Sequence, residues 1–195
     1  MLKIDVLPLG DYQTNCYILH NEDSRDCVIL DPGYEPEIIS RFLEEKGLTL
    51  RAILLTHCHF DHVGAVKELA AQTDCRVYLC QKDLAMPPML TNGPLYYTDT
   101  YADGDTVTQA GIPFRVLETP GHTPGSVCLI TGGNLFSGDT LFAGSCGRTD
   151  LPGGDSRAMR DSLRRLAALK ENYNVYPGHG SASTLDREKQ TNPYL

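Results

Sequence analysis

The stretch THCHFDHVGA, residues 56–65, places three histidines and an aspartate between His57 and His62. It follows the apolar run RAILLT, a predicted strand, and precedes VGAVKELAAQ, which is rich in helix-forming residues. In an extended segment side chains two positions apart point the same way, so His57 and His59 project together while Cys58 points to the other side. The stretch therefore predicts a strand-to-helix turn that presents a pair of metal ligands.

Asp61 and His62 lie beyond this first pair of histidines, because the chain must turn before the helix that we expect to begin by about Val63. A carboxylate and a histidine that are left out of one tetrahedral ligand shell can begin a second shell. The pattern therefore favours two neighbouring metal ions over one.

The other ligands that two ions need stand far along the chain. His122 in ETPGHTPGS and His179 in YPGHGS each follow a Pro-Gly turn at the end of a predicted strand, and Asp139 in LFSGDT follows an apolar run. Five of the six histidines thus stand in loops at strand ends, where side chains can converge beside a rigid scaffold. The sixth, His20, is expected to be an ordinary hydrogen-bonded residue.

Composition and charge limit the classes of protein to consider. The 195 residues suit one compact domain, residues 1–195, with a substantial core. A formal net charge of −8 without a basic cluster disfavours nucleic-acid binding, which requires a concentrated positive surface. With neither a long apolar span nor a leader segment, the chain is expected to be cytoplasmic and to bind no membrane. The seven scattered cysteines form no C-x-x-C pair and are expected to be reduced thiols.

Local patterns predict strands interspersed with helices. Short strand-like runs open the chain, and EPEIISRFLEEKG predicts an amphipathic helix that ends at Gly47 and turns Ile38, Ile39, Phe42 and Leu43 inward. SRAMRDSLRRLAAL predicts a second helix with Ser156 as its N-cap. Residues 82–105, rich in proline and glycine, are expected to form a long loop that carries Tyr96, Tyr97 and Tyr101. Together these elements favour helices that cover a sheet core.

The segments THCHFDH, PGHT, SGD and PGHG, in this order over nearly the whole chain, resemble the metallo-β-lactamase fold superfamily. The resemblance implies an α+β fold, a four-layer αββα sandwich with the metals at one edge. It assigns one metal ion to His57, His59 and His122, the second to Asp61, His62 and His179, and the bridging position to Asp139. TNCYI and VILDPG also resemble the family, which implies that Asp31 contacts a metal-binding side chain and not the metal ion itself.

GDTLFAGSCGRTDLPGGD and EKQTNPYL resemble the short glyoxalase II-like hydrolases of this superfamily, thioesterases for hydroxyacyl thiol conjugates such as S-lactoylglutathione. The resemblance implies a small-molecule thioester substrate and two divalent metal ions. Zn²⁺ is expected, and iron or manganese suits the same nitrogen and carboxylate ligands. Two such ions lower the pKa of a shared water to about neutral and polarise a carbonyl. Asp61 and Asp139 are the expected catalytic residues, with Asp61 orienting the nucleophile or accepting its proton.

The sequence departs from full-length glyoxalase II in two places. The loop after Asp139 carries Gly147-Arg148-Thr149-Asp150 instead of a lysine and a tyrosine, and sixteen residues follow His179 where that enzyme has a helical domain. Arg148 is a candidate for binding a carboxylate of the substrate, with a salt bridge within the loop as the alternative. Tyr96 and Tyr97 are candidates for lining the acyl or thiol pocket, with packing under the loop as the alternative.

Other functions fit the same residues. Persulfide dioxygenases share this fold and a similar G-R-T-D loop, but they use one iron, which His57, His122 and Asp139 would hold here. A metal-binding module without catalysis is a further alternative. Nuclease members of the superfamily are disfavoured by the negative charge.

Overall fold

The computed structural model describes residues 1–195 and contains two six-stranded sheets. The first sheet has the strand order β1-β2-β3-β4-β5-β6, and the second has the order β14-β13-β10-β9-β8-β7. The strands of the first sheet are β1 (Leu2–Leu9), β2 (Thr14–Asn21), β3 (Asp26–Leu30), β4 (Thr49–Leu54), β5 (Arg76–Cys80) and β6 (Asp99–Tyr101). Those of the second are β7 (Thr106–Gln109), β8 (Ile112–Glu118), β9 (Val127–Thr131), β10 (Asn134–Gly138), β13 (Asn174–Pro177) and β14 (Ser183–Thr184). A separate small hairpin joins β11 (Leu141–Phe142) to β12 (Ser145–Cys146).

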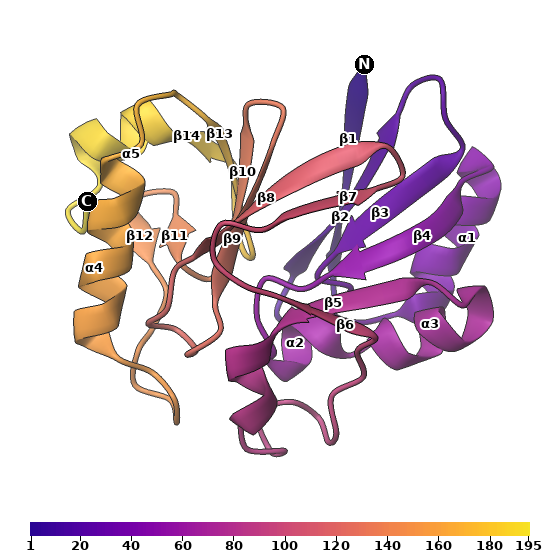
Figure 1. Cartoon of the computed structure of the whole chain (residues 1–195), viewed down its shortest axis with the longest axis horizontal. Helices are drawn as coiled ribbons and strands as arrows, with labels where there is room; N and C mark the ends of the chain where they lie inside the picture. The colour runs from indigo at the N-terminus through magenta and orange to yellow at the C-terminus, as the bar shows by residue number, and fades with distance from the viewer.

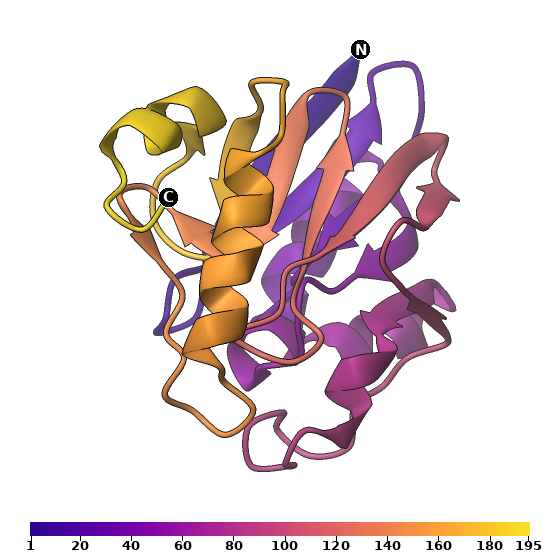
Figure 2. The same cartoon turned by 60° about the vertical axis from the view of Figure 1, so that its left-hand side comes forward.

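Helices cover the outer face of each sheet, so the molecule has four layers. They are α1 (Pro36–Lys46), α2 (Phe60–Val63), α3 (Val66–Thr73), α4 (Ser156–Ala167) and α5 (Leu185–Thr191), with a 3-10 helix η1 (Gln81–Ala85). Figure 1 shows α1 and α3 on the side of the first sheet and α4 and α5 on the opposite side. Figure 2 shows α4 lying across the second sheet. The predicted α+β fold with an αββα layer order is confirmed.

Strand β2 shows why the sandwich needs strands that are apolar on both faces. Cys16 and Ile18 pack in the core between the first sheet and its helices, whereas Tyr17 and Leu19 pack in the core between the two sheets. Alternate side chains of a strand point to opposite faces, so a strand with a layer on each side buries every residue. Each buried large aliphatic side chain contributes about 1.5–3 kcal/mol. The CYIL part of this strand, residues 16–19, is therefore an unbroken apolar run and not an alternating one.

The helix ends follow local sequence signals, with two departures from the predictions. Helix α1 ends at Gly47, whose φ of 65° lies in the left-handed region that glycine adopts without strain. Ile38 on this helix is exposed, so the buried face is narrower than predicted. The N-cap of α4 is Asp155 and not Ser156, because the Asp155 carboxylate accepts the backbone N–H groups of Arg157 and Ala158.

The predicted long loop over residues 82–105 has regular secondary structure at both ends. It begins in η1 and ends in β6, where Tyr101 is buried and its hydroxyl donates to the Leu55 carbonyl. The loop assignment of Tyr101 was therefore wrong, because the proline and glycine residues that suggested a loop lie on either side of β6, up to Pro94 before it and at Gly104 after it. All seven cysteines are free, as predicted. No helix combines the length and the apolar composition needed to cross a lipid bilayer.

Polar contacts tie the two sheets together at one edge of the sandwich. The Tyr17 hydroxyl and the Asn15 side-chain amide both donate to the Pro177 carbonyl, at 2.7 and 3.0 Å. The backbone N–H of Asn15 donates to the Gly178 carbonyl at 2.8 Å. Strand β2 of the first sheet is thereby fixed to the end of β13 in the second, immediately before His179.

Candidate metal centre

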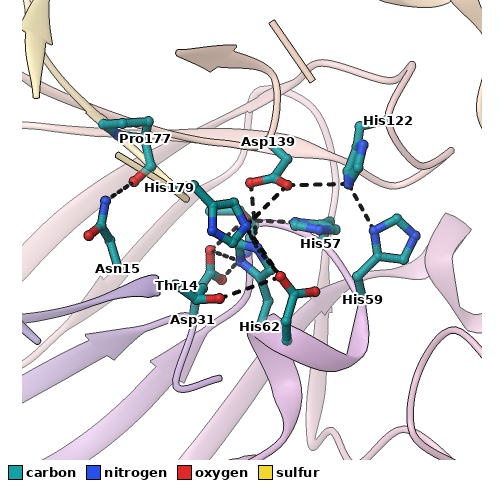
Figure 3. A network of polar contacts seen from close by, with 12 residues as sticks. Thr14, Asn15, Asp31, His57, His59, His62, His122, Asp139, Pro177 and His179 are labelled. Atoms are coloured by element: carbon teal, nitrogen blue, oxygen red, sulfur yellow. Dashed lines mark hydrogen bonds and ion pairs between the residues drawn. The ribbon is translucent and has the colours of Figure 1, made fainter. Parts of the chain in front are cut away.

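Five histidines and two aspartates from four separate loops converge at this edge (Figure 3). Three groups have ligand atoms within 4.8 Å of one another: the first set is His57, His59 and His122, the second set is Asp61, His62 and His179, and a third group joins Asp31 to His57 and His62. The first two are the sets that the family resemblance implied. Asp139 lies between them. The structure thus brings all seven predicted residues together, and their role as metal ligands stays a prediction.

The segment from His57 to His62 supplies donors to both sets. His57 and His59 follow β4 in extended backbone, and their ring centroids lie 4.9 Å apart. His59 is the N-cap of α2, so Asp61 and His62 stand on a helical turn, and the His62 ring centroid lies 4.1 Å from that of His57. The helix begins three residues earlier than predicted, at Phe60, and a break separates α2 from α3. This geometry explains how one short segment serves two neighbouring sites.

The first set consists of nitrogen donors in a buried pocket. The Nδ1 atom of His59 lies 2.8 Å from Nε2 of His122, and the His57 ring centroid lies 4.8 Å from that of His122. Burial, together with the neighbouring histidines, holds the pKa of His57 well below its usual range. The same causes lower the pKa of His59 to about 4. Both rings are therefore neutral at pH 7, which is the form of imidazole that binds metal ions.

The second set places histidines against carboxylates. The Oδ2 atom of Asp61 lies 3.2 Å from Nε2 of His179 and 3.6 Å from Nε2 of His62. Burial disfavours a charge on His179, but Asp139 and Asp61 outweigh burial and raise the pKa of His179 to about 10. The pKa of buried His62 is raised in the same way, by Asp139 and Asp31. A metal ion that binds here takes the place of the protons that these carboxylates hold on the two histidines, so binding at this set releases protons.

Asp139 contacts both sets. Its Oδ2 atom lies 3.5 Å from Nε2 of His122 and 3.5 Å from Nε2 of His179, and its Oδ1 atom lies 3.4 Å from Nε2 of His62. Burial opposes its ionisation, yet His62 and His179 hold the pKa of Asp139 well below its usual range. An ionised carboxylate between two donor sets has the position expected of a bridging ligand.

Several buried polar atoms of the centre have no hydrogen-bond partner within the protein: Nε2 of His57, Nε2 of His59 and Oδ1 of Asp139. Leaving such an atom unpaired costs about 1–3 kcal/mol, so a cluster of them fits a site that is completed by an ion. Gly178 keeps the centre open, because a Cβ atom there would lie 2.2 Å from Oδ1 of Asp139. Imidazole and carboxylate donors suit zinc, iron and manganese. The residues therefore fit a pair of divalent cations.

The outer nitrogens of three histidines are held by oxygen atoms. The pairs are Nδ1 of His62 with Oδ2 of Asp31 at 3.0 Å, Nδ1 of His122 with the Arg148 carbonyl at 2.8 Å, and Nδ1 of His179 with the Tyr12 carbonyl at 3.0 Å. Such partners fix the ring orientation and leave the other nitrogen free for a metal ion. Asp31 also accepts the N–H and hydroxyl of Thr56, at 2.7 and 2.6 Å. It lies where the resemblance implied, directly behind His62.

The predicted substrate residues lie outside the two sets. The Arg148 guanidinium is exposed and forms a two-pronged ion pair with Asp150, at 2.7 and 2.8 Å, which is the loop salt bridge considered as its alternative. Tyr96 and Tyr97 are both exposed on the loop after η1. Tyr96 lines a surface hollow together with Val63. A substrate role for these three residues stays a prediction.

Aromatic residues beside the second set were missed by the sequence analysis. The rings of Tyr12 and Phe60 meet edge to face with centroids 5.4 Å apart, and the Phe142 ring lies 6.3 Å from that of His179. Of these three residues, only Phe60 could have been placed near the ligands from the local sequence, since it is the neighbour of His59 in the chain. Tyr12 and Phe142 come from distant turns that nothing in the local sequence connects with the ligands.

Residues 9–179 match the family described as the metallo-beta-lactamase superfamily. The chain belongs to this superfamily. It is 40% identical to the probable metallo-hydrolase YqgX of Bacillus subtilis, over 97% of this chain and 95% of that protein. It is 34% identical to the hydroxyacylglutathione hydrolase GloC of Haemophilus influenzae, over 100% of this chain and 98% of the relative. These relatives support a metal-dependent hydrolase.

Solved structures of superfamily members share the whole fold. The crystal structure of the BLEG-1 B3 metallo-beta-lactamase has a TM-score of 0.91 and 38% identity, covering 100% of this chain and 99% of that one. TTHA1623 in a di-iron-bound form has a TM-score of 0.85 and 40% identity, with coverage of 98% and 100%. ETHE1 from Myxococcus xanthus has a TM-score of 0.85 and 30% identity, with coverage of 98% and 83%. The metal centre is thus set in a fold that also holds a di-iron site.

Proposed function

We propose that this superfamily member is a dinuclear metal-dependent thioesterase that hydrolyses hydroxyacyl thiol conjugates such as S-lactoylglutathione. The observation that carries the proposal is the pairing of two donor sets across one carboxylate, Asp139. The similarity to GloC over nearly the full length of both chains supports the substrate class. The proposal includes one domain over residues 1–195, a cytoplasmic location, and no nucleic-acid or membrane partner, which the charge of −8 favours.

The proposed ligands are His57, His59 and His122 for one ion, Asp61, His62 and His179 for the other, and Asp139 for both. Zn²⁺ remains the expected metal, since its tetrahedral sites take three protein ligands and an open position. Iron is the main alternative, because the similar TTHA1623 structure is described as di-iron-bound. Manganese suits the same donors.

When bound, two divalent cations lower the pKa of a water molecule to about neutral and polarise a carbonyl group. The burial of the two sets determines from which side a substrate can approach. The first set is almost fully buried, whereas His179 is 27% exposed. The carbonyl therefore approaches over the second set, where Asp61 is placed to orient the attacking water or accept its proton. Asp61 is itself held from behind by the Thr14 hydroxyl, which donates to Oδ2 at 3.4 Å.

The organic part of the substrate is proposed to pack against Tyr12, Phe60 and Phe142, which lie on this open side. Aromatic side chains supply a large apolar contact surface at low conformational cost. Arg148 remains a candidate for a substrate carboxylate, provided that the carboxylate displaces Asp150 from the guanidinium. Tyr96 and Tyr97 remain candidates on the neighbouring loop.

The test combines elemental analysis of the purified protein with a hydrolysis assay on S-lactoylglutathione. Two metal ions per chain and turnover that disappears on chelation are the expected results. Two ions without turnover on any thioester of a hydroxyacyl panel would refute the substrate assignment. Asp61→Asn separates the roles of this residue, because the variant should keep its metal and lose turnover if Asp61 handles the proton. Full turnover in that variant would remove Asp61 from catalysis.

A one-iron dioxygenase is the second candidate function. The likeness to ETHE1 and the Gly147-Arg148-Thr149-Asp150 loop favour it. In that case His57, His122 and Asp139 would hold the iron, and the convergence of the second set would have no function. Oxygen consumption with glutathione persulfide and one iron per chain would support this candidate over the thioesterase. A β-lactam belongs in the same panel, because a similar structure is named as a β-lactamase.

A further inference from the structure

Asp83 is a fully buried acid that belongs to neither donor set. It lies in η1, and its exposed fraction is 0%. Taking an ionised carboxylate out of water costs several kcal/mol unless hydrogen bonds compensate. Its neighbours before it in QKDLA are the polar Gln81 and Lys82, and nothing in this local sequence gives a reason for burying the acid. A buried acid in such a segment requires partners that explain its position.

The partners of Asp83 come from the chain segment that carries His122. The Oδ2 atom accepts the Thr123 hydroxyl at 3.0 Å, and the Oδ1 atom accepts the backbone N–H of Gly125 at 2.6 Å. Gly125 allows this approach, because a Cβ atom at that position would lie 2.6 Å from the carboxylate. The loop immediately after His122 is therefore closed onto Asp83.

Cys58 reaches the same carboxylate from the other ligand segment. Cys58 packs in the same core as Met86, and Leu84, the neighbour of Asp83 in η1, packs against that core. Burial and the nearby Asp83 carboxylate raise the pKa of the Cys58 thiol. Cys58 is fully buried between His57 and His59 in the chain, with its side chain on the face opposite to theirs. One carboxylate thus lies between the two segments that together supply the whole first set, hydrogen-bonded to one and beside Cys58 of the other.

We propose that Asp83 is the positioning residue of the first set: it clamps the His57–His59 segment to the loop that follows His122 and so preforms three nitrogen donors. This inference rests on metal binding by the centre and not on the choice of substrate. Asp83 touches none of the ligand side chains, so it acts only through the backbone and through Cys58 and Thr123.

The chemistry of the carboxylate makes the proposal testable with a small change. Several donors point at its two oxygens, and an amide offers one acceptor oxygen and an NH₂ group that would face a donor. Asp83→Asn keeps the size of the side chain and releases one of the two segments. Loss of a residue that orients ligands from behind typically weakens metal binding about 10–100-fold. We expect that loss at the first set.

Glu188→Gln is the matched control. Glu188 is also a buried acid, and it accepts hydrogen bonds from the Gly144 N–H, the Ser183 hydroxyl and the Asn192 amide. None of these partners belongs to either donor set. The control therefore loses a buried carboxylate of the same kind and should keep wild-type metal affinity.

The experiment measures the apparent Kd for Zn²⁺ by competition with a chelator, and locates the ions by anomalous diffraction. In Asp83→Asn we expect reduced occupancy among His57, His59 and His122, a higher occupancy at the second set, and binding about 10–100-fold weaker at the first. Wild-type affinity at the first set would overturn the proposal. An equal loss at both sets, or the same loss in Glu188→Gln, would also overturn it, because the effect would then be general destabilisation.

Thr123→Val tests the proposed role of Asp83 if Asp83→Asn does not fold. It removes a single donor to Asp83 and preserves the shape of the side chain. The expected result is a folded protein whose first-set affinity falls by up to about tenfold, in line with one hydrogen bond. Unchanged affinity in this variant would contradict the clamp.

Discussion

The two donor sets are built on opposite electrostatic principles. The first set has only imidazole nitrogens, and burial keeps His57 and His59 neutral by lowering their pKa values. The second set surrounds two imidazoles with carboxylates, and Asp61 and Asp139 raise the pKa of His179 to about 10. One set is thus ready to bind a cation as it stands, whereas the other set must release protons from its histidines before it binds one.

The two sets also differ in what holds them. Ligand atoms of the second set are held directly, as His62 is by Asp31 and His179 by the Tyr12 carbonyl. In the first set, the Arg148 carbonyl holds His122 and the Thr56 hydroxyl lies 3.2 Å from Nδ1 of His57, and Asp83 in addition holds the loop that follows His122. The difference teaches that the neutral nitrogen pocket depends on the position of its loops as well as on partners that touch the ligands, while the charged pocket depends on carboxylates that touch its ligands.

Asp139→Ala is expected to have the largest effect, because it removes the one side chain that both sets share. Metal affinity and turnover should each fall by more than about 100-fold, the upper end for residues that only orient ligands. Metal content after dialysis and the rate of thioester hydrolysis are the measurements. A variant that keeps two ions would show that the sets are independent.

The paired variants His122→Ala and His179→Ala separate the sets. Each removes one nitrogen ligand, so each should lower the metal content from two ions to one, but at different positions. Anomalous maps should show the first-set ion missing from the His122 variant and the second-set ion missing from the His179 variant. Loss of the same ion in both variants would show that the two sets form a single site.

Asp31→Asn tests whether direct contacts matter more for the second set. Asp31 faces His62 and also accepts the Thr56 hydroxyl, which lies 3.2 Å from Nδ1 of His57. We expect an affinity loss of about 10–100-fold that is larger at the second set, the reverse of the order expected for Asp83→Asn. The same chelator competition measures it, and an identical order in the two variants would contradict the comparison.

The smallest expected effect concerns stability away from the sets. Burial disfavours ionisation of Glu188, but hydrogen bonds from Ser183, Gly144 and Asn192 outweigh burial and lower its pKa. A lowered pKa in the folded state adds stability above the unfolded value of about 4.3, and this stability is lost as the pH falls through the folded pKa. Glu188→Gln should therefore be less stable than the wild type at pH 7, by about 1 kcal/mol, and the difference should shrink in acid.

Urea unfolding at pH 7 and below pH 4 measures this difference. A difference in the free energy of unfolding that stays constant across that range would show that the ionised form of Glu188 adds no stability. The metal content of the variant should match that of the wild type at pH 7, which keeps it valid as the control for Asp83→Asn.

The sequence predicted well which residues converge, because each lies in a short motif that can be recognised from the local sequence. The alternation of His57, Cys58 and His59 and the Pro-Gly turns before His122 and His179 already place side chains at strand ends. The layer order followed from the family resemblance and from strands that are apolar on both faces. The structure confirms that convergence and adds the distances.

The residues that support the donors were harder to predict, because their roles depend on contacts between distant segments. Asp83 stands in a short segment with no recognisable motif and acquires its role only when the His122 loop folds onto it. Ser156 and Asp155 are both good N-cap residues, and only the backbone conformation selects Asp155. Tyr101 was assigned to a loop because its own strand has three residues and follows a segment rich in proline.

The most direct test of the account is a crystal structure of the zinc-loaded protein with anomalous data at the zinc edge. The account predicts two peaks, one among His57, His59 and His122 and the other among Asp61, His62 and His179, with Asp139 bound to both. A single ion held by His57, His122 and Asp139, with an empty second set at saturating zinc, would contradict it.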